Sequence, residues 1–150
     1  MHLSTLEGKI LNNIQSDLPF VSQPFKVLSN QLGIKEEMLL QMLKRLKDKG
    51  VIRNFVISLN HTKLGFKSTL VGLRVSSNKT ESLAKDITRY PEVTHCFLRL
   101  GDYNLWSVFI YSKKERLRQF LDFLAKKAGK ENVLNLPTER KFKLNTRLTV

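Results

Sequence analysis

The sequence predicts an α+β protein with two parts, a group of three helices and a following domain in which strands and helices alternate. Apolar residues recur at helical spacing through the first fifty residues. Beyond them, several segments alternate apolar and polar residues, which is typical of strands, and segments of helical spacing fall in between. The change of period falls at Gly50, a residue typical of a helix end.

The first part is expected to contain three short helices. Leu6, Ile10 and Ile14 share one helical face, with Ser4 or Thr5 before them as the N-cap. A second helix is predicted over 24–32, with its proline in the first turn, and a third over 35–49. The residues of the third helix expected to face inward are Met38, Leu39, Met42, Leu43 and Leu46. A glycine turn between the second and third helices predicts a helix-turn-helix.

The second part is predicted to follow the order β-α-β-β-α-β. A strand over 51–59 and a turn over 60–65 lead into it. Its elements are then a strand (68–75), a helix (79–90), two hairpin strands joined at residues 101–102, a helix (113–128) and a strand (133–144). This order is that of a ferredoxin-like domain. The expected boundaries are 1–53 for the helix-turn-helix domain, 54–66 for the linking strand and turn, and 67–150 for the ferredoxin-like ligand-binding domain.

Composition limits the class of protein. The chain has 150 residues, a formal net charge of +13 and one cysteine. No apolar run is long enough to span a membrane, no signal-peptide pattern opens the chain, and a lone cysteine favours the cytoplasm. Residues 61–150 hold eighteen Lys and Arg against eight Asp and Glu, so most of the positive charge belongs to the second part. Such a charge indicates a nucleic acid or an anionic small molecule as the partner.

The hairpin over 90–111 is the candidate binding site. Strand alternation predicts that His95 and Arg99 share one face, about 13 Å apart, together with Val93 and Phe97. Tyr103 and Trp106 follow just past the turn. Aromatic rings beside a histidine and an arginine are typical of the floor of a pocket for a large, flat, anionic ligand.

Each candidate has a simpler alternative. A lone histidine on a strand is most often structural, and His61 is expected in a loop. Arg140 and Lys143 lie in a terminal segment that either protects an edge strand or holds the anionic ligand. Cys96 is expected on the opposite strand face from His95, so thiol catalysis is not expected. The chain has no glycine-rich phosphate loop, no paired-carboxylate constellation, and no HExxH or CxxC metal spacing.

The helix-turn-helix makes DNA the main alternative partner. A recognition helix contacts bases with its N-terminal residues, which here are Lys35, Glu36, Glu37 and the aliphatic residues after them. Two carboxylates at that end would repel a duplex. We therefore expect the motif to be a packing module that does not bind DNA.

Five blocks of sequence carry a more specific resemblance. They are 14–19 (IQSDLP) with 24–25 (PF), 63–66 (KLGF) with 68–71 (STLV), 90–91 (YP) with 93–95 (VTH), 103–106 (YNLW), and 134–140 (LNLPTER) with 142–143 (FK). In this order they resemble siroheme decarboxylases of the Lrp/AsnC-like superfamily, and among them the alpha-type subunit. Two positions depart from the family pattern. Cys96-Phe97 stands where an asparagine and an aromatic residue are usual, and Trp106-Ser107-Val108 stands where Trp-Phe-Thr is usual, so a different pocket lining is expected.

The resemblance implies a carboxy-lyase that removes two acetate carboxyl groups from sirohaem to give didecarboxysirohaem, in the alternative haem or haem d1 pathway. It implies an iron tetrapyrrole as substrate, no separate cofactor, and a paralogous beta-type subunit in a heterodimer, or a homo-oligomer. His95 is then a catalytic acid or an axial ligand of the substrate iron, and His61 is a second catalytic candidate. The resemblance implies Arg99, Tyr103 and Trp106 as substrate-binding residues, and Arg53, Arg140 and Lys143 are further predicted substrate-binding residues. A transcription regulator that senses an anionic molecule or haem, and a non-catalytic partner subunit, are the alternatives.

Overall fold

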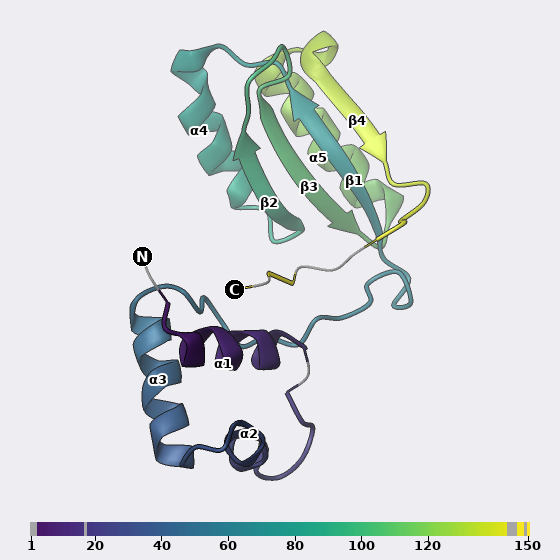
Figure 1. The fold of residues 1–150 in the computed structure, drawn as a ribbon. Helices are drawn as coiled ribbons and strands as arrows, with labels where there is room; N and C mark the ends of the chain where they lie inside the picture. The colour runs from purple at the N-terminus through teal and green to yellow at the C-terminus, as the bar shows by residue number, and fades with distance from the viewer. Residues whose placement is uncertain (1–2, 17, 144–146, 149) are drawn as a thin grey trace. The chain divides into compact units, whose positions relative to one another are not determined.

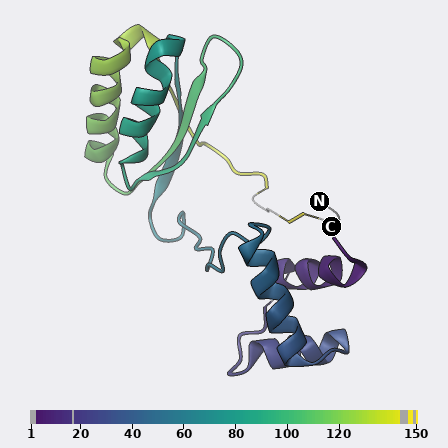
Figure 2. The same cartoon turned by 90° about the vertical axis from the view of Figure 1, so that its left-hand side faces the viewer.

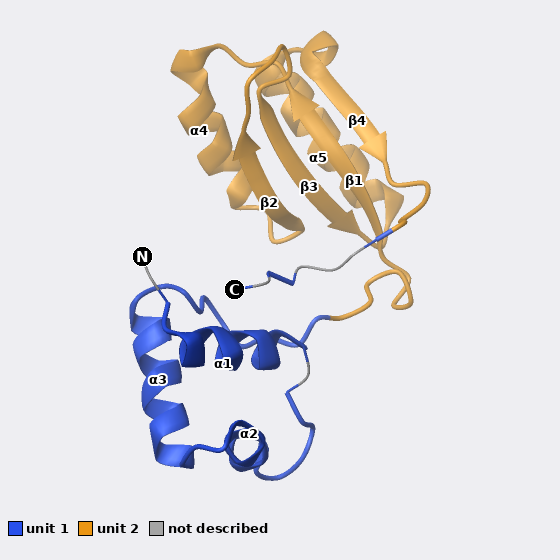
Figure 3. Cartoon of the chain, viewed as in Figure 1, with its two compact units in different colours: residues 1–58, 143–150 blue, residues 59–142 orange. Residues whose placement is uncertain are grey.

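The computed structural model describes residues 3–16, 18–143, 147–148 and 150. The chain divides into two compact units (Figure 3). Unit 1 contains residues 1–58 and 143–150, and unit 2 contains residues 59–142. The division falls inside the predicted linking segment, and the predicted domain limits themselves stay a prediction.

Unit 1 contains the three predicted helices, α1 (Thr5–Ser16), α2 (Pro24–Leu32) and α3 (Glu36–Asp48). Gly33 makes the turn between α2 and α3 with a φ of 67°, which a residue without a Cβ adopts without strain. The helices bury a small apolar core that includes Ile10, Leu28, Leu39 and Leu46. The prediction that Met38 faces inward is wrong, because its side chain is 46% exposed.

The start of α1 is fixed by a capping box. The Ser4 backbone N–H donates to Glu7 Oε2 at 2.7 Å, and the Glu7 backbone N–H donates to Ser4 Oγ at 3.2 Å. These bonds satisfy donors that a helix N-terminus otherwise leaves free. Arg45 of α3 binds the same carboxylate at 2.6 Å, which ties the first helix to the third.

The predicted strand over 51–59 is wrong for this chain. Ile52 packs into the core of unit 1, but no part of the segment pairs with another described strand. The apolar residues that follow Ile52 in this segment are exposed, among them Val56 at 80% and Ile57 at 82%. Strand-like alternation produces a strand only where a partner offers hydrogen bonds.

Unit 2 has the predicted β-α-β-β-α-β order (Figure 1). Its elements are β1 (Lys67–Leu73), α4 (Ser77–Thr88), β2 (Val93–Leu98), β3 (Leu105–Tyr111), α5 (Lys114–Ala128) and β4 (Val133–Pro137). The sheet order is β2-β3-β1-β4, and every neighbouring pair is antiparallel. The ferredoxin-like prediction is therefore confirmed.

The core of unit 2 lies between the sheet and its two helices. Figure 2 shows α4 and α5 together on one face of the sheet. Phe109 of β3 stacks on Phe120 of α5 with ring centroids 4.2 Å apart. Residues of β3 alternate between buried and half-buried, because alternate side chains point toward and away from the helices. Within residues 59–142, no helix covers the second face, called the open face below.

The last strand is shorter than predicted. It ends at Pro137, whose register partner is Thr69 near the start of β1. Thr138 adds one backbone hydrogen bond to Ser68, and the chain then leaves the sheet because β1 offers few further partners. The predicted end of this strand, residue 144, lies outside the described residues.

Candidate active site

A β-bulge sets which hairpin residues reach the open face. Val93 pairs with Phe109 and His95 pairs with Val108, so Thr94 is an extra residue in β2. After the bulge, His95 and Phe97 point to the open face, whereas Val93 packs against the core. The prediction that Val93 shares a face with His95 is therefore wrong, because simple alternation does not include the extra residue.

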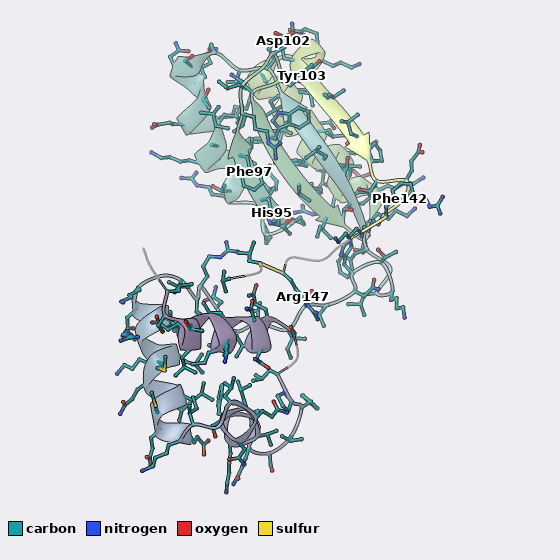
Figure 4. The ribbon with its side chains drawn as sticks, in the orientation of Figure 1. His95, Phe97, Asp102, Tyr103, Phe142 and Arg147 are labelled. Atoms are coloured by element: carbon teal, nitrogen blue, oxygen red, sulfur yellow. The ribbon has the colours of Figure 1, made fainter. Side chains whose placement is uncertain are left out.

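His95 and Phe97 of β2, which is an edge strand of the sheet, form a row with Arg99, which follows the end of this strand. The His95 and Phe97 rings stack with centroids 5.7 Å apart and planes 29° apart. The guanidinium carbon of Arg99 lies 5.6 Å from the centre of the Phe97 ring. Figure 4 labels His95 and Phe97 on this strand, and all three side chains are exposed. The row presents an imidazole, a flat ring and a cation to any molecule on this face.

Trp106 and Tyr103 lie beside this row. Trp106 is the register partner of Phe97, and its ring centroid is 6.3 Å from that of Tyr103. The indole N–H donates to the Tyr103 carbonyl oxygen at 2.7 Å, which fixes the orientation of the ring. Gly72 of β1 lies under the indole: a Cβ at this position would come within 2.8 Å of it. The guanidinium carbon of Arg74 lies 5.3 Å from the centre of the Tyr103 ring.

Leucines continue the apolar surface across β1 and β4. Leu70 is 38% exposed and Leu136 is 43% exposed, and the two are register partners. The strand residues that register and alternation place on the open face are Ser68, Leu70, Gly72, His95, Phe97, Trp106, Val108, Ile110, Leu134 and Leu136. A sheet face with this composition can hold a broad aromatic molecule, with a cation and a proton carrier along one edge.

The two departures from the family pattern have different consequences. Cys96 and Ser107 are register partners on the face that α4 and α5 cover, so they do not line the open face. Burial raises the pKa of the Cys96 thiol. This placement agrees with the prediction that Cys96 and His95 lie on opposite faces. Of these positions, Phe97, Trp106 and Val108 reach the candidate site.

His61 lies in the loop before β1, as predicted. Its Nε2 contacts Lys141 Nζ, which also donates to Thr62 Oγ1 at 3.0 Å. The fold thus brings together a histidine and a lysine that are 80 residues apart in the sequence. Among the described residues, His61 and His95 form no hydrogen bond with each other, since His61 contacts Lys141 and His95 contacts Thr94.

The remaining predicted contacts are exposed cations. Arg140 lies beyond β4, with its guanidinium carbon 4.8 Å from the centre of the Phe142 ring. Arg53 and Lys143 are exposed residues of unit 1. The role of these three residues as substrate contacts stays a prediction.

Sequence reasoning missed three residues around the site. Phe97 was placed on the correct face but given no role, although it stacks with His95 and lies under Arg99. Gly72 and Arg74 carry no motif. The register between β1 and β3 places Gly72 under Trp106, and Arg74, which follows the end of β1, lies over the Tyr103 ring. No group of three or more potential metal-ligating residues occurs in the described parts of the chain. None of the described helices has the length and apolar character needed to cross a membrane.

The architecture defines the class of protein. Residues 63–143 match the AsnC-like ligand binding domain, and residues 7–53 match the siroheme decarboxylase NirDL-like HTH domain. An AsnC family transcriptional regulator from Agrobacterium tumefaciens has the same fold, with a TM-score of 0.80 over 97% of this chain and 96% of the regulator at 21% identity. The chain thus combines a helix-turn-helix with an AsnC-like ligand-binding domain.

Sequence similarity is more specific than the fold. The siroheme decarboxylase alpha subunit of Oleidesulfovibrio alaskensis is 33% identical over 95% of this chain and 86% of the relative. The alpha subunit of Desulfovibrio desulfuricans is 31% identical over 95% of this chain and 82% of the relative. The chain belongs to the siroheme decarboxylase family.

A solved structure extends the comparison to a longer relative. The siroheme decarboxylase NirDL is 30% identical, with a TM-score of 0.71 over 97% of this chain and 48% of NirDL. NirDL has also been solved in co-complex with an iron-uroporphyrin III analogue, and that structure gives a TM-score of 0.70. This chain therefore spans about half the length of a relative that binds an iron tetrapyrrole analogue.

Proposed function

We propose that this chain is a subunit of a siroheme decarboxylase and that the open face of unit 2 carries the substrate site. The observation that carries the proposal is the row of His95, Phe97 and Arg99 beside Trp106 on one exposed sheet face. Sirohaem is a flat macrocycle with carboxylates around its rim. The aromatic side chains match the plane of the ring, and the arginine matches a rim carboxylate.

The reaction needs a place for an electron pair and a source for a proton. When carbon dioxide leaves an acetate side chain, the bond between the carboxyl carbon and the methylene carbon breaks. Its electron pair stays on the methylene carbon and is delocalised into the conjugated macrocycle, which is why no separate cofactor is needed. A proton delivered to that carbon completes the methyl group, and no electron is gained or lost overall.

Two roles are proposed for this chain's own residues. Arg99 holds a carboxylate that is retained, because a guanidinium donates two parallel hydrogen bonds to a carboxylate. His95 supplies the proton or ligates the substrate iron, and it suits the first task because histidine is the side chain that most often acts as a general acid. The Thr94 hydroxyl lies 3.0 Å from His95 Nδ1 and orients the ring, which leaves Nε2 for the substrate.

A partner subunit completes the site in this proposal. The open face leaves Phe97, Leu70 and Leu136 exposed, and a single sheet face contacts only one side of a macrocycle. The relatives named alpha subunit or NirD subunit carry names that imply a second subunit. The Hydrogenobacter thermophilus siroheme decarboxylase is more than twice the matched length, since the match covers 42% of it, which leaves room for a second unit in one polypeptide. A paralogous subunit in a heterodimer is the proposed partner, with a homo-oligomer as the alternative.

The test is His95→Ala in the purified subunit pair, assayed for carbon dioxide release from sirohaem without oxygen. Loss of a general acid is expected to slow release by about 10²–10⁴-fold. His61→Ala in the same assay tests the second catalytic candidate, and a smaller loss is expected because His61 contacts Lys141 instead of the hairpin row. Unchanged turnover of His95→Ala would remove His95 from the mechanism. The absorption spectrum of bound sirohaem separates the two roles, since only loss of an iron ligand shifts it.

A regulator is the second candidate function, and the AsnC regulator fold favours it. Against it, α3 begins with Glu36 and Glu37, at the end that a recognition helix presents to DNA. A gel shift with DNA from upstream of the chain's own gene tests it. Salt-dependent, sequence-specific retardation supports a regulator, and its absence supports a helix-turn-helix kept for packing.

A further inference from the structure

A cleft on the helix side of unit 2 lies apart from the open face. It has a volume of about 680 Å³ and is formed by the end of β1, the first turns of α4 and the end of α5. Val75 and Leu83 line it and are 9% and 6% exposed, which gives it an apolar floor. His95, Phe97 and Arg99 of the hairpin row do not line the cleft, and Arg74, which also contacts the Tyr103 ring, lies at the border between the cleft and the candidate active site.

Cationic side chains from three elements converge on this cleft. Lys127 binds the Asp86 carboxylate at 3.1 Å, so its charge is already compensated. Arg74 and Lys79 form no ion pair with any described residue. The Tyr103 ring, 5.3 Å from the guanidinium carbon of Arg74, holds this arginine in place. Two uncompensated cations therefore face one cavity.

The polar lining completes a site for an anion. Ser76, Asn78 and Ser82 also line the cleft and offer hydroxyl and amide hydrogen bonds. A guanidinium binds a planar carboxylate through two N–H groups, and an ammonium adds a point charge. We propose that this cleft is a second binding site, for a small organic molecule that carries a carboxylate on an apolar body. The proposal does not depend on the proposed function.

Two sources of such a carboxylate must be distinguished. One is a free small molecule, and the other is a side chain of a tetrapyrrole, which carries the same group. The experiment uses the full-length ¹⁵N-labelled chain and follows backbone amide shifts at constant ionic strength. Benzoate is the first probe, with chloride as the control anion, and uroporphyrin is the second probe.

Benzoate is expected to shift the amides of residues 74–83 and 127–132 in a saturable manner. Lys79→Gln is expected to weaken this binding about tenfold, because it removes a charged partner. Arg74→Lys keeps the charge but loses the two-pronged contact, so an intermediate loss is expected. Lys85→Gln is the matched control: Lys85 is an exposed lysine of α4 that does not line the cleft. Its benzoate affinity should stay within about twofold.

Three results overturn the proposal. Shifts that do not saturate, or that spread over all lysine-rich surfaces, indicate non-specific charge attraction. Equal losses for Lys79→Gln and Lys85→Gln lead to the same conclusion. Uroporphyrin shifts at the same amides that benzoate competes away would make the cleft part of the tetrapyrrole site and end its separate role. The amide spectra of all variants also report whether each variant is folded.

Discussion

Replacing Gly72 with alanine tests the packing that holds the Trp106 ring on the open face. A Cβ on Gly72 would lie 2.8 Å from Trp106 Cζ3 and 2.9 Å from Cη2, whereas ordinary contact begins near 3.4 Å. The indole therefore has to move by roughly 0.6 Å or more to reach ordinary contact. Its hydrogen bond to the Tyr103 carbonyl, at 2.7 Å, resists this movement.

The size of the effect follows from two opposing terms. An extra methyl group in a well-packed site costs about 1–3 kcal/mol. The φ of Gly72 is not positive, so alanine fits the backbone and stabilises by about 0.4–1 kcal/mol through the unfolded chain. A net loss of about 1 kcal/mol is expected, which lowers the Tm of a domain of this size by roughly 4–8 °C.

Fluorescence offers a direct assay, since Trp106 is the one tryptophan of the chain. Urea unfolding followed by its emission gives the free energy of unfolding of unit 2, and the emission maximum of the folded state reports the displaced ring. If the clash is the cause, adding Gly72→Ala to a Trp106→Leu variant should change the free energy of unfolding little or not at all relative to Trp106→Leu alone. Circular dichroism follows the unfolding of these two variants, which lack the tryptophan. A single Gly72→Ala variant at least as stable as the parent, with unchanged emission, would refute the reasoning.

Three further predictions concern other parts of the chain. The backbone N–H of Ser4 and the Arg45 side chain lower the pKa of Glu7 from 4.5 to about 2. The stabilisation that the Glu7 carboxylate gives the folded state is therefore complete above pH 4.5 and is lost as the pH falls toward 2. Glu7→Gln should flatten this limb of an acid-unfolding curve measured by circular dichroism, and an unchanged limb contradicts the assignment. Burial raises the pKa of the Cys96 thiol, so iodoacetamide is expected to alkylate the native chain far more slowly than the urea-unfolded chain. Equal alkylation rates would place Cys96 on an accessible face. Ser107 Oγ is buried with no hydrogen-bond partner in the described structure, so Ser107→Ala should raise the free energy of urea unfolding by about 1 kcal/mol. A loss of stability would show that the hydroxyl has a hydrogen-bond partner.

Local patterns were enough to predict the elements of both units. The helical spacing from Leu6 to Leu46 and the glycine at residue 33 predicted the helix-turn-helix, and alternation after residue 67 predicted the sheet. The segment over 51–59 shows the limit of this approach. It is rich in β-branched and aromatic residues, as strands are, but the described chain offers it no strand partner. A sequence contains the side chains of a strand but not the neighbour that pairs with it.

The sequence by itself determined the order of the elements, the family, and the presence of His95, Arg99, Tyr103 and Trp106 on one hairpin, because these depend on residues close together in the chain. Only the tertiary structure decided which of their neighbours share the face. The bulge at Thr94 sends Val93 to the core, and the register of β1 against β3 places Gly72 under the Trp106 ring. These relations depend on hydrogen bonds between strands, whose register no single strand specifies on its own.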